Sequence, residues 1–364
     1  MFPPRFHTFT VMCLWMIAGV MAAGCSDDNP TQSSQMGWAP LGPGIGVEPI
    51  ACTVYDNMLL AGGSFTTAGG ASANRIAAWD GSSWAPLGTG MDAWVRALTV
   101  YDDNLIAGGR FTTAGGVSAN YVAAWDGASW TTLGTGLGGY SVTVYALTVY
   151  DGKLIAGGVF TTAGGVSANR IAAWDGSSWA PLGTGMDARI NALTVYDNKL
   201  IAGGDFATAG GVSANHIATW DGSSWTPLQT GIDSWVRALT VYDNKLIAGG
   251  HFTTAGGVSA DNIAAWDGSS WTSLGTGMDD WIDALTVYDN KLIAGGDFTT
   301  AGGVSANRIA AWDGSSWASL GSGTDSYVGA LTVYDNKLIA GGEFSTAGGV
   351  SANNIAAWGS RLGL

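Results

Sequence analysis

The sequence predicts an all-β fold, a seven-bladed β-propeller with four antiparallel strands per blade, from three observations. A tryptophan-centred phrase recurs along the chain every 46 residues, with a single spacing of 49. Apolar runs of strand length alternate with Asp-Asn or Asp-Gly pairs, which are residues typical of hairpin turns. No segment shows a helical period of sufficient length. A fixed period in the forties with four short strands is the signature of a propeller blade, so residues 38–358 are expected to form the propeller.

The fourth repeat shows how the strands are assigned. Apolar strands are expected at 179–183 (WAPLG), 192–196 (ALTVY), 199–206 (KLIAGGDF) and 216–220. Loops are expected between them, at 184–191 and 207–215. The pairs Asp197-Asn198 and Asp221-Gly222 are both expected to form type I′ hairpins, because these residues tolerate positive φ.

The two ends of the repeat region complement each other. The region starts with one strand, residues 38–42, and stops after IAAW at 355–358, where a following strand is missing. We therefore expect the N-terminal strand to complete the last blade and to cover an edge that would otherwise stay open. Residues 359–364 are expected to be a C-terminal tail.

Residues 1–24 are expected to be a signal peptide rather than part of the fold. The apolar run from Phe9 to Ala23 is short for a transmembrane helix, and it ends in small residues directly before Cys25. This junction resembles a bacterial lipobox, and the resemblance implies that Cys25 is lipidated and becomes the mature N-terminus. Residues 25–37 then form a flexible tether to a membrane of the bacterial cell envelope, at the outer membrane or cell surface. Secretion after ordinary cleavage is the alternative.

The composition excludes some partners. The formal net charge of −14 and the pI near 4.3 argue against nucleic acid and against an anionic membrane surface. Fourteen of the 18 tryptophans recur with every blade, so they are assigned to packing between blades, and Gly203-Gly204 and their equivalents to close approach of neighbouring sheets. Cys52 stands where other repeats have Leu and is expected to be a buried apolar residue.

The repeat carries a family resemblance. The Gly-Gly that closes LIAGG, the Asp-Gly turn and the spaced tryptophans resemble kelch-type repeats. The full pattern "IA-WDG-SW-LG-G…AL-VY…L-AGG-F…GG" is closer to propeller repeats of secreted bacterial proteins and also resembles those of fungal cortical polarity-marker proteins. The resemblance covers nearly all of residues 38–358. It implies a fold and no single activity, because such propellers serve many functions.

The seven copies differ at three places, and these supply the candidate binding residues. The places are the loop that enters each blade, the position before the second-strand Phe, and the start of the third strand, all expected on one face. We expect this face to bind a protein or a glycan, with no cofactor and no metal, in a protein that is a monomer. The candidates are Trp94, Tyr140, Arg189, Trp235, Trp281, Tyr327, Arg110, Asp205, His216, His251, Asp297, Arg308 and Glu343.

A catalytic role is not favoured by the sequence. Only His216 and His251 remain after signal removal, and no nucleophile or metal-ligand pattern stands out. The alternative reading is an enzyme acting on extracellular polysaccharide, with an acid pair drawn from Asp205, Asp297 and Glu343. The cross-strand pairs Asp297/Arg308 and Asp205/His216 are equally expected as ordinary surface pairs.

Overall fold

A computed structural model describes residues 36–360 of the chain. In this range all regular secondary structure is β-strand, which confirms the all-β prediction. Across the same residues, the structure has no helix of the length and apolarity needed to cross a membrane. The predicted signal peptide, Cys25, most of the tether and residues 361–364 lie outside the described residues.

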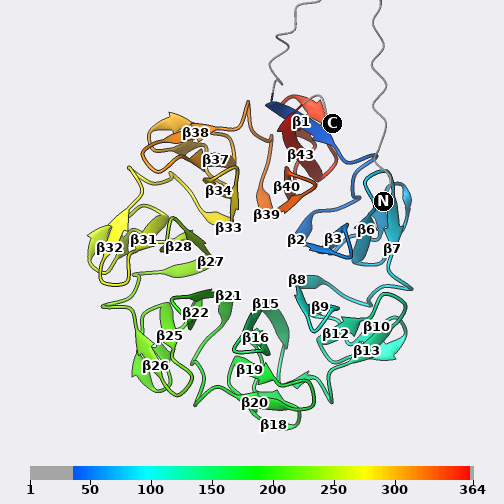
Figure 1. The fold of residues 1–364 in the computed structure, drawn as a ribbon, viewed down its shortest axis with the longest axis vertical. Helices are drawn as coiled ribbons and strands as arrows, with labels where there is room; N and C mark the ends of the chain where they lie inside the picture. The colour runs from blue at the N-terminus through cyan, green and yellow to red at the C-terminus, as the bar shows by residue number, and fades with distance from the viewer. Residues whose placement is uncertain (1–35, 361–364) are drawn as a thin grey trace, which may run out of the picture. The chain divides into compact units, whose positions relative to one another are not determined.

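Residues 36–360 contain seven four-stranded antiparallel sheets, which lie around a common centre (Figure 1). The strand nearest the centre is β2 (Pro49–Tyr55), β8 (Val95–Tyr101), β15 (Thr143–Tyr150), β21 (Ile190–Tyr196), β27 (Trp235–Tyr242), β33 (Ile282–Tyr288) or β39 (Val328–Tyr334). The second strand is β3 (Met58–Gly63), β9 (Asn104–Gly109), β16 (Lys153–Val159), β22 (Lys199–Gly204), β28 (Lys245–His251), β34 (Lys291–Gly296) or β40 (Lys337–Gly342).

The two outer strands carry the repeated tryptophans. The third strand is β6 (Ile76–Trp79), β12 (Val122–Trp125), β19 (Ile171–Trp174), β25 (Ile217–Trp220), β31 (Ile263–Trp266), β37 (Ile309–Trp312) or β43 (Ile355–Ser360). The fourth is β7 (Trp84–Pro86), β13 (Trp130–Thr132), β20 (Trp179–Pro181), β26 (Trp225–Pro227), β32 (Trp271–Ser273), β38 (Trp317–Ser319) or β1 (Met36–Pro40).

The segment between the second and third strands is more ordered than predicted. It was expected to be a loop, but in every repeat it contains a small hairpin of two-residue strands. These strands are β4 (Thr67–Ala68) and β5 (Ala71–Ser72), β10 (Thr113–Ala114) and β11 (Val117–Ser118), β17 (Thr162–Ala163) and β18 (Val166–Ser167), β23 (Thr208–Ala209) and β24 (Val212–Ser213), β29 (Thr254–Ala255) and β30 (Val258–Ser259), β35 (Thr300–Ala301) and β36 (Val304–Ser305), and β41 (Thr346–Ala347) and β42 (Val350–Ser351), with β14 (Leu137–Gly138) added beside β17.

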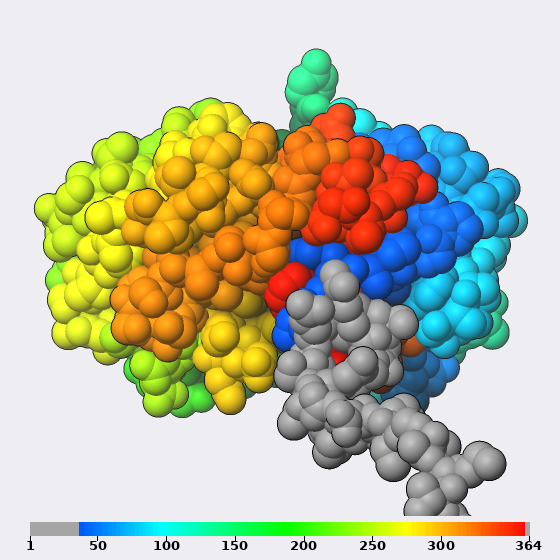
Figure 2. Space-filling view, turned by 90° about the horizontal axis from the view of Figure 1, so that it is seen from above, coloured from blue at the N-terminus to red at the C-terminus, as the bar shows by residue number. Residues whose placement is uncertain are grey.

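The first and last strands of the described range lie in one sheet. Strand β1 pairs antiparallel with β43, and Trp38 lies opposite Trp358. The pairing extends beyond the predicted boundaries: β1 begins at Met36, and Gly359 and Ser360 belong to β43 rather than to a tail. The two ends of the described chain are also side by side at the surface, in blue and red (Figure 2).

The two hairpin types differ, which corrects part of the turn prediction. At Asp197-Asn198 both residues have positive φ, 50° and 56°, as a type I′ turn requires. At Asp221-Gly222 only the glycine does, so this turn is not type I′. Here the Asp221 carboxylate accepts hydrogen bonds from the backbone N–H and the hydroxyl of Ser223 and of Ser224. The phrase WDGSSW is therefore a four-residue loop closed by its own aspartate.

The cores lie between neighbouring sheets. Residues from two adjacent sheets form each cluster, and one cluster joins Leu59 and Ala77 of the first sheet to Ile339 and Ile355 of the last. The outer tryptophans tie the sheets together through their indole N–H: Trp84 donates to the Leu41 carbonyl at 3.0 Å, across a sheet boundary. Trp38, Trp130, Trp179, Trp225 and Trp317 make the same bond to the preceding repeat. This agrees with the packing role predicted for the repeated phrase.

Trp271 and the paired glycines depart from this packing pattern. Trp271 lacks an indole partner within residues 36–360, and Gln229 replaces the glycine beside the expected acceptor, the Leu228 carbonyl. The paired glycines also have different roles. A Cβ on Gly203 would meet Val236 of the next sheet, as predicted, whereas a Cβ on Gly204 would meet the Arg189 backbone carbonyl of its own sheet.

The aspartate loops predict that the domain loses stability in acid. Hydrogen bonds from two backbone amides, those of the second and third residues after the aspartate, hold the pKa of each loop carboxyl below its usual range, to about 2 at Asp221. Lowered folded-state pKa values give stability that is present above the unfolded value, about 3.9, and is lost as the pH falls through the folded values. The loops whose aspartate has this lowered pKa are those at Asp80, Asp126, Asp175, Asp221, Asp267 and Asp313.

Thermal unfolding of residues 36–360 should therefore show a midpoint that holds from pH 7 to about 4.5 and falls steadily below about 4. In Asp221→Ala the thermal midpoint should fall less steeply with decreasing pH, because one carboxyl whose protonation destabilises the fold is removed. A midpoint unchanged between pH 5 and about 2.5 would contradict the role given to these loops.

Candidate functional site

A fourth position at which the repeats differ, missed by the sequence reasoning, lies at the centre of the molecule. In each innermost strand the pairing with the second strand shifts register by one residue, between Val95 and Ala97 in β8, for example. This β-bulge turns the extra residue out of the ladder. The bulge residues are Ile50, Arg96, Tyr145, Asn191, Arg237, Asp283 and Gly329.

All seven bulge residues line one cavity of about 230 Å³, and Arg189 and Tyr327 complete its wall. A second cavity of about 220 Å³ continues along the same strands and is lined mainly by the repeated Ala and Leu residues. Apart from Cys52, which stands where the other repeats have Leu, the lining differs from repeat to repeat only at the bulges. We name the part lined by the bulge residues, Arg189 and Tyr327 the channel mouth. Its signal in the sequence was the residue before each "AL" ("AC" in the first repeat), which is different in every repeat except for two arginines.

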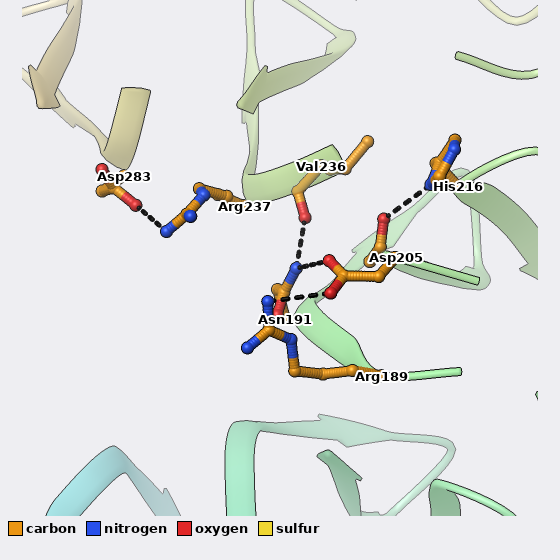
Figure 3. Close-up of polar contacts among 8 residues, drawn as sticks. Arg189, Asn191, Asp205, His216, Val236, Arg237 and Asp283 are labelled. Atoms are coloured by element: carbon orange, nitrogen blue, oxygen red, sulfur yellow. Dashed lines mark hydrogen bonds and ion pairs between the residues drawn. The ribbon is translucent and has the colours of Figure 1, made fainter. Parts of the chain in front are cut away.

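On one side of the channel mouth, an arginine–aspartate ion pair lies among aromatic side chains. The Arg237 guanidinium pairs with the Asp283 carboxylate at 2.8 Å (Figure 3). It also lies over the Trp281 ring, at 4.7 Å from the ring centroid. Trp235 lies edge-on to Trp281 at 6.4 Å between centroids, and His251 lies 4.8 Å from Trp281. The structure thus brings together three of the predicted residues, Trp235, Trp281 and His251, around an ion pair that was not predicted.

A second ion pair links predicted residues beside this cluster. Arg189 pairs with the Asp205 carboxylate at 2.8 Å, and the Asn191 amide donates to the same carboxylate at 2.8 Å and to the Val236 carbonyl at 3.0 Å (Figure 3). Asp205 is therefore paired with Arg189 and not with the His216 side chain, which was the partner expected from the sequence. The His216 Nδ1 instead lies 3.2 Å from the Gly204 carbonyl oxygen.

The opposite side of the channel mouth holds a cation without a carboxylate. The Arg96 guanidinium lies 4.7 Å from the Trp94 ring and 5.2 Å from the Tyr145 ring. Arg110 lies over the same Trp94 at 5.8 Å. Within residues 36–360, neither arginine has a carboxylate within ion-pair distance, and the buried Nε of Arg96 has no hydrogen-bond partner. Trp94 and Arg110 were predicted, whereas Arg96 and Tyr145 were not.

The remaining predicted residues lie away from the channel mouth. Tyr140 is 94% exposed. It lies in segment 138–144, which carries the three extra residues of the 49-residue spacing and projects from the molecule in Figure 2. Arg308 lies 4.0 Å from Asp297, which agrees with the surface pair considered from sequence. Glu343 is exposed, and neither it nor Asp297 lines the cavity. The structure therefore does not gather Asp205, Asp297 and Glu343 into one acid pair.

Burial changes the ionisation of the channel groups. Burial raises the pKa of the Asp283 carboxyl, and the Arg237 charge offsets part of this rise. Burial also raises the pKa of the Tyr327 phenol above its usual range. It lowers the pKa of Arg96, and the like charges of Arg110 and Arg189 add to the effect. Cys52 lines the deeper cavity, is half-buried, and has a thiol whose pKa desolvation raises to about 12.

The described residues contain no group of three or more His, Cys, Asp or Glu side chains placed to hold a metal ion. The channel mouth presents guanidinium donors, carboxylate and amide oxygens as acceptors, phenols and aromatic rings, which are groups that can contact a ligand.

Comparisons with known proteins agree with the ring of sheets. Residues 129–288 match the family model described as the Rax2 C-terminal beta propeller domain. Residues 289–310 and 335–356 match a beta-propeller model described as a domain of unknown function, DUF5122. No curated protein sequence matches the chain. The likeness to β-propeller repeats is thus confirmed, while the likeness to kelch-type, secreted bacterial or fungal repeats stays a prediction.

Solved structures show the same fold. The computationally designed Ika8 protein is similar with a TM-score of 0.53 at 19% identity, over 87% of this chain and 98% of that one. The WD40 beta propeller domain of Doa1 has a TM-score of 0.56 at 14% identity, over 90% and 97%. The extracellular domain of the putative hybrid two component system BT4673 from B. thetaiotaomicron has a TM-score of 0.56 at 10% identity, over 90% of this chain and 40% of that one. The chain contains a β-propeller, a fold that suggests a binding or scaffold role.

Proposed function

We propose that residues 36–360 form a seven-bladed β-propeller that is completed by β1 and acts as a non-catalytic binding or scaffold module. Its ligand is a protein or a glycan, recognised on the face that carries the channel mouth and the loops entering each blade. The observation that supports this proposal most is that residues that differ between the repeats lie together around one cavity. Repeats that are nearly identical in their cores present seven bulge positions, with six residue types, to one cavity.

The aromatic residues around the channel mouth suit recognition. Trp94 and Trp235 are each 38% exposed although they contact arginines, and large aromatic side chains with arginine dominate binding surfaces. In the proposed setting the module is anchored in the cell envelope through lipid on Cys25, or is secreted. No acid pair converges at the channel mouth within residues 36–360, which is why the proposal is non-catalytic.

Tryptophan fluorescence of the propeller, titrated with a panel of neutral and acidic oligosaccharides and peptides, tests this function. We expect a saturable change with at least one ligand class, and a loss of roughly tenfold or more in affinity for Trp94→Ala, Trp235→Ala or Trp281→Ala. Tyr101→Phe, at the other end of an innermost strand, is the control and should bind as the unmodified protein does. Binding that survives all three tryptophan changes would place the site elsewhere.

A further inference from the structure

The charge at the channel mouth is not balanced. Three arginines and one aspartate line the cavity: Arg96, Arg189, Arg237 and Asp283. Arg237 is paired with Asp283, and Arg189 with Asp205 just outside the wall. Of these three arginines, only Arg96 has no carboxylate partner within residues 36–360, in a chain whose formal net charge is −14. A local positive charge within an acidic protein calls for a specific explanation, because burying an unpaired guanidinium has a desolvation cost.

The aromatic rings beside Arg96 leave the N–H donors of its guanidinium free. Aromatic rings lie near its guanidinium, Trp94 at 4.7 Å and Tyr145 at 5.2 Å, and the side chain forms no hydrogen bond within the described residues. Stacking uses the faces of a guanidinium, while its N–H groups point outward in the plane and match a carboxylate with two parallel bonds. The aromatic rings thus orient Arg96 without using its donors.

We propose that the channel mouth binds a carboxylated sugar, whose carboxylate pairs with Arg96 and whose hydroxyls contact the polar bulge residues. This inference rests on the proposed binding function and names its ligand class. The cavity of about 230 Å³ is of the size of one sugar unit. Around it lie N–H donors on Arg237, acceptors on the Asn191 amide oxygen and the Asp283 carboxylate, and a phenol on Tyr327.

The mixture of donors and acceptors favours a sugar acid over an acidic peptide. A hydroxyl both donates and accepts hydrogen bonds, so a polyhydroxylated ring can use the Asp283 carboxylate as well as the amide and guanidinium groups. An aspartate or glutamate side chain carries a carboxylate alone, so it can pair with Arg96 but brings no hydroxyl groups to the polar bulge residues. Phosphate would also pair with Arg96, so inorganic phosphate is one of the competing ligands in the test.

Isothermal titration calorimetry of the propeller with glucuronate and galacturonate, against glucose and galactose, tests the proposal. We expect the uronates to bind at least roughly tenfold more tightly than the neutral sugars, with an affinity that falls as salt is added. Arg96→Gln should weaken uronate binding roughly 10- to 100-fold, as expected for loss of a charged hydrogen-bonded pair. Arg96→Lys should give an intermediate loss, since it keeps the charge and loses the paired N–H geometry.

Arg170→Gln is the matched control, because it removes an arginine that does not line the cavity, and it should leave uronate binding unchanged. Circular dichroism and the thermal midpoint check that each variant folds. Equal binding by Arg96→Gln, equal binding of uronates and neutral sugars, or no binding of either would overturn the proposal. So would tighter binding of an Asp- or Glu-containing tripeptide, or of inorganic phosphate, than of uronates. If these results came with ligand binding that depends on Trp94, Trp235 or Trp281, the proposed function would stand and only the ligand class would fall.

Discussion

Trp38→Ala is expected to destabilise the propeller by about 3–5 kcal/mol, the usual cost of removing a buried tryptophan side chain. Trp38 is 5% exposed, donates its indole N–H to the Leu320 carbonyl at 2.9 Å, and lies 5.4 Å from the Trp358 ring. All of these contacts join the first strand of the described chain to its last repeats. If β1 completes the seventh blade as proposed, this one change weakens the junction between the two ends.

Trp225→Ala is the matched control for that change. Trp225 has the same place in its own sheet, is 4% exposed and donates the equivalent bond to the Leu182 carbonyl, but its contacts join two sheets in the middle of the chain. Urea unfolding should give similar losses of free energy for the two variants. A Trp38→Ala protein that unfolds like the unmodified one, beside a destabilised Trp225→Ala, would show that β1 is not part of the folded ring.

Gly204→Ala is expected to cost about 3 kcal/mol in the free energy of unfolding, at the upper end of overpacking effects. A Cβ at this position would meet the carbonyl oxygen of Arg189, which is backbone and cannot rotate away. Gly204 pairs with Ile190 immediately before the register shift that places Asn191 at the channel mouth. The glycine thus permits the bulge that presents the variable residue, and the substitution should perturb the site as well as the fold.

Gly211→Ala separates this clash from the general effect of losing a glycine. Gly211 has a φ of 84°, and a methyl group added there would meet nothing within 4 Å. Only the left-handed backbone strain should count at this position, about 1 kcal/mol. Thermal and urea unfolding of both variants gives the comparison. Equal losses for the two would mean that the close approach at Gly204 has no energetic role.

The fold was predictable because its signals are local and repeated. The alternation within ALTVY and the Asp-Asn turns define strands and hairpins residue by residue, and the repetition of WDGSSW multiplies that signal. Asp221-Gly222 was misassigned as a type I′ turn because the sequence does not show that the Asp221 side chain closes the loop. The hairpin β23–β24 was missed because two-residue strands carry too few residues to show a period.

The site was predictable only in part. Trp94, Trp235 and Trp281 were found because aromatic residues differ between loops that are otherwise similar. Arg96 and Arg237 were missed because their position, equivalent to Asn191, was assigned to the end of the loop that enters the blade, whereas it forms a bulge inside the innermost strand. The ion pair of Arg237 with Asp283 joins neighbouring sheets, and only the arrangement of the sheets brings the two residues together.

Hydrogen–deuterium exchange, with and without the tightest-binding member of the oligosaccharide and peptide panel, tests the central claim most directly. The claim is that the face with the channel mouth is the binding surface. We expect slower exchange in peptides covering 94–97, 143–147, 235–238 and 281–284, and unchanged exchange at the Asp-Asn hairpins such as Asp197-Asn198. Protection at those hairpins, with none at the channel mouth, would contradict the account.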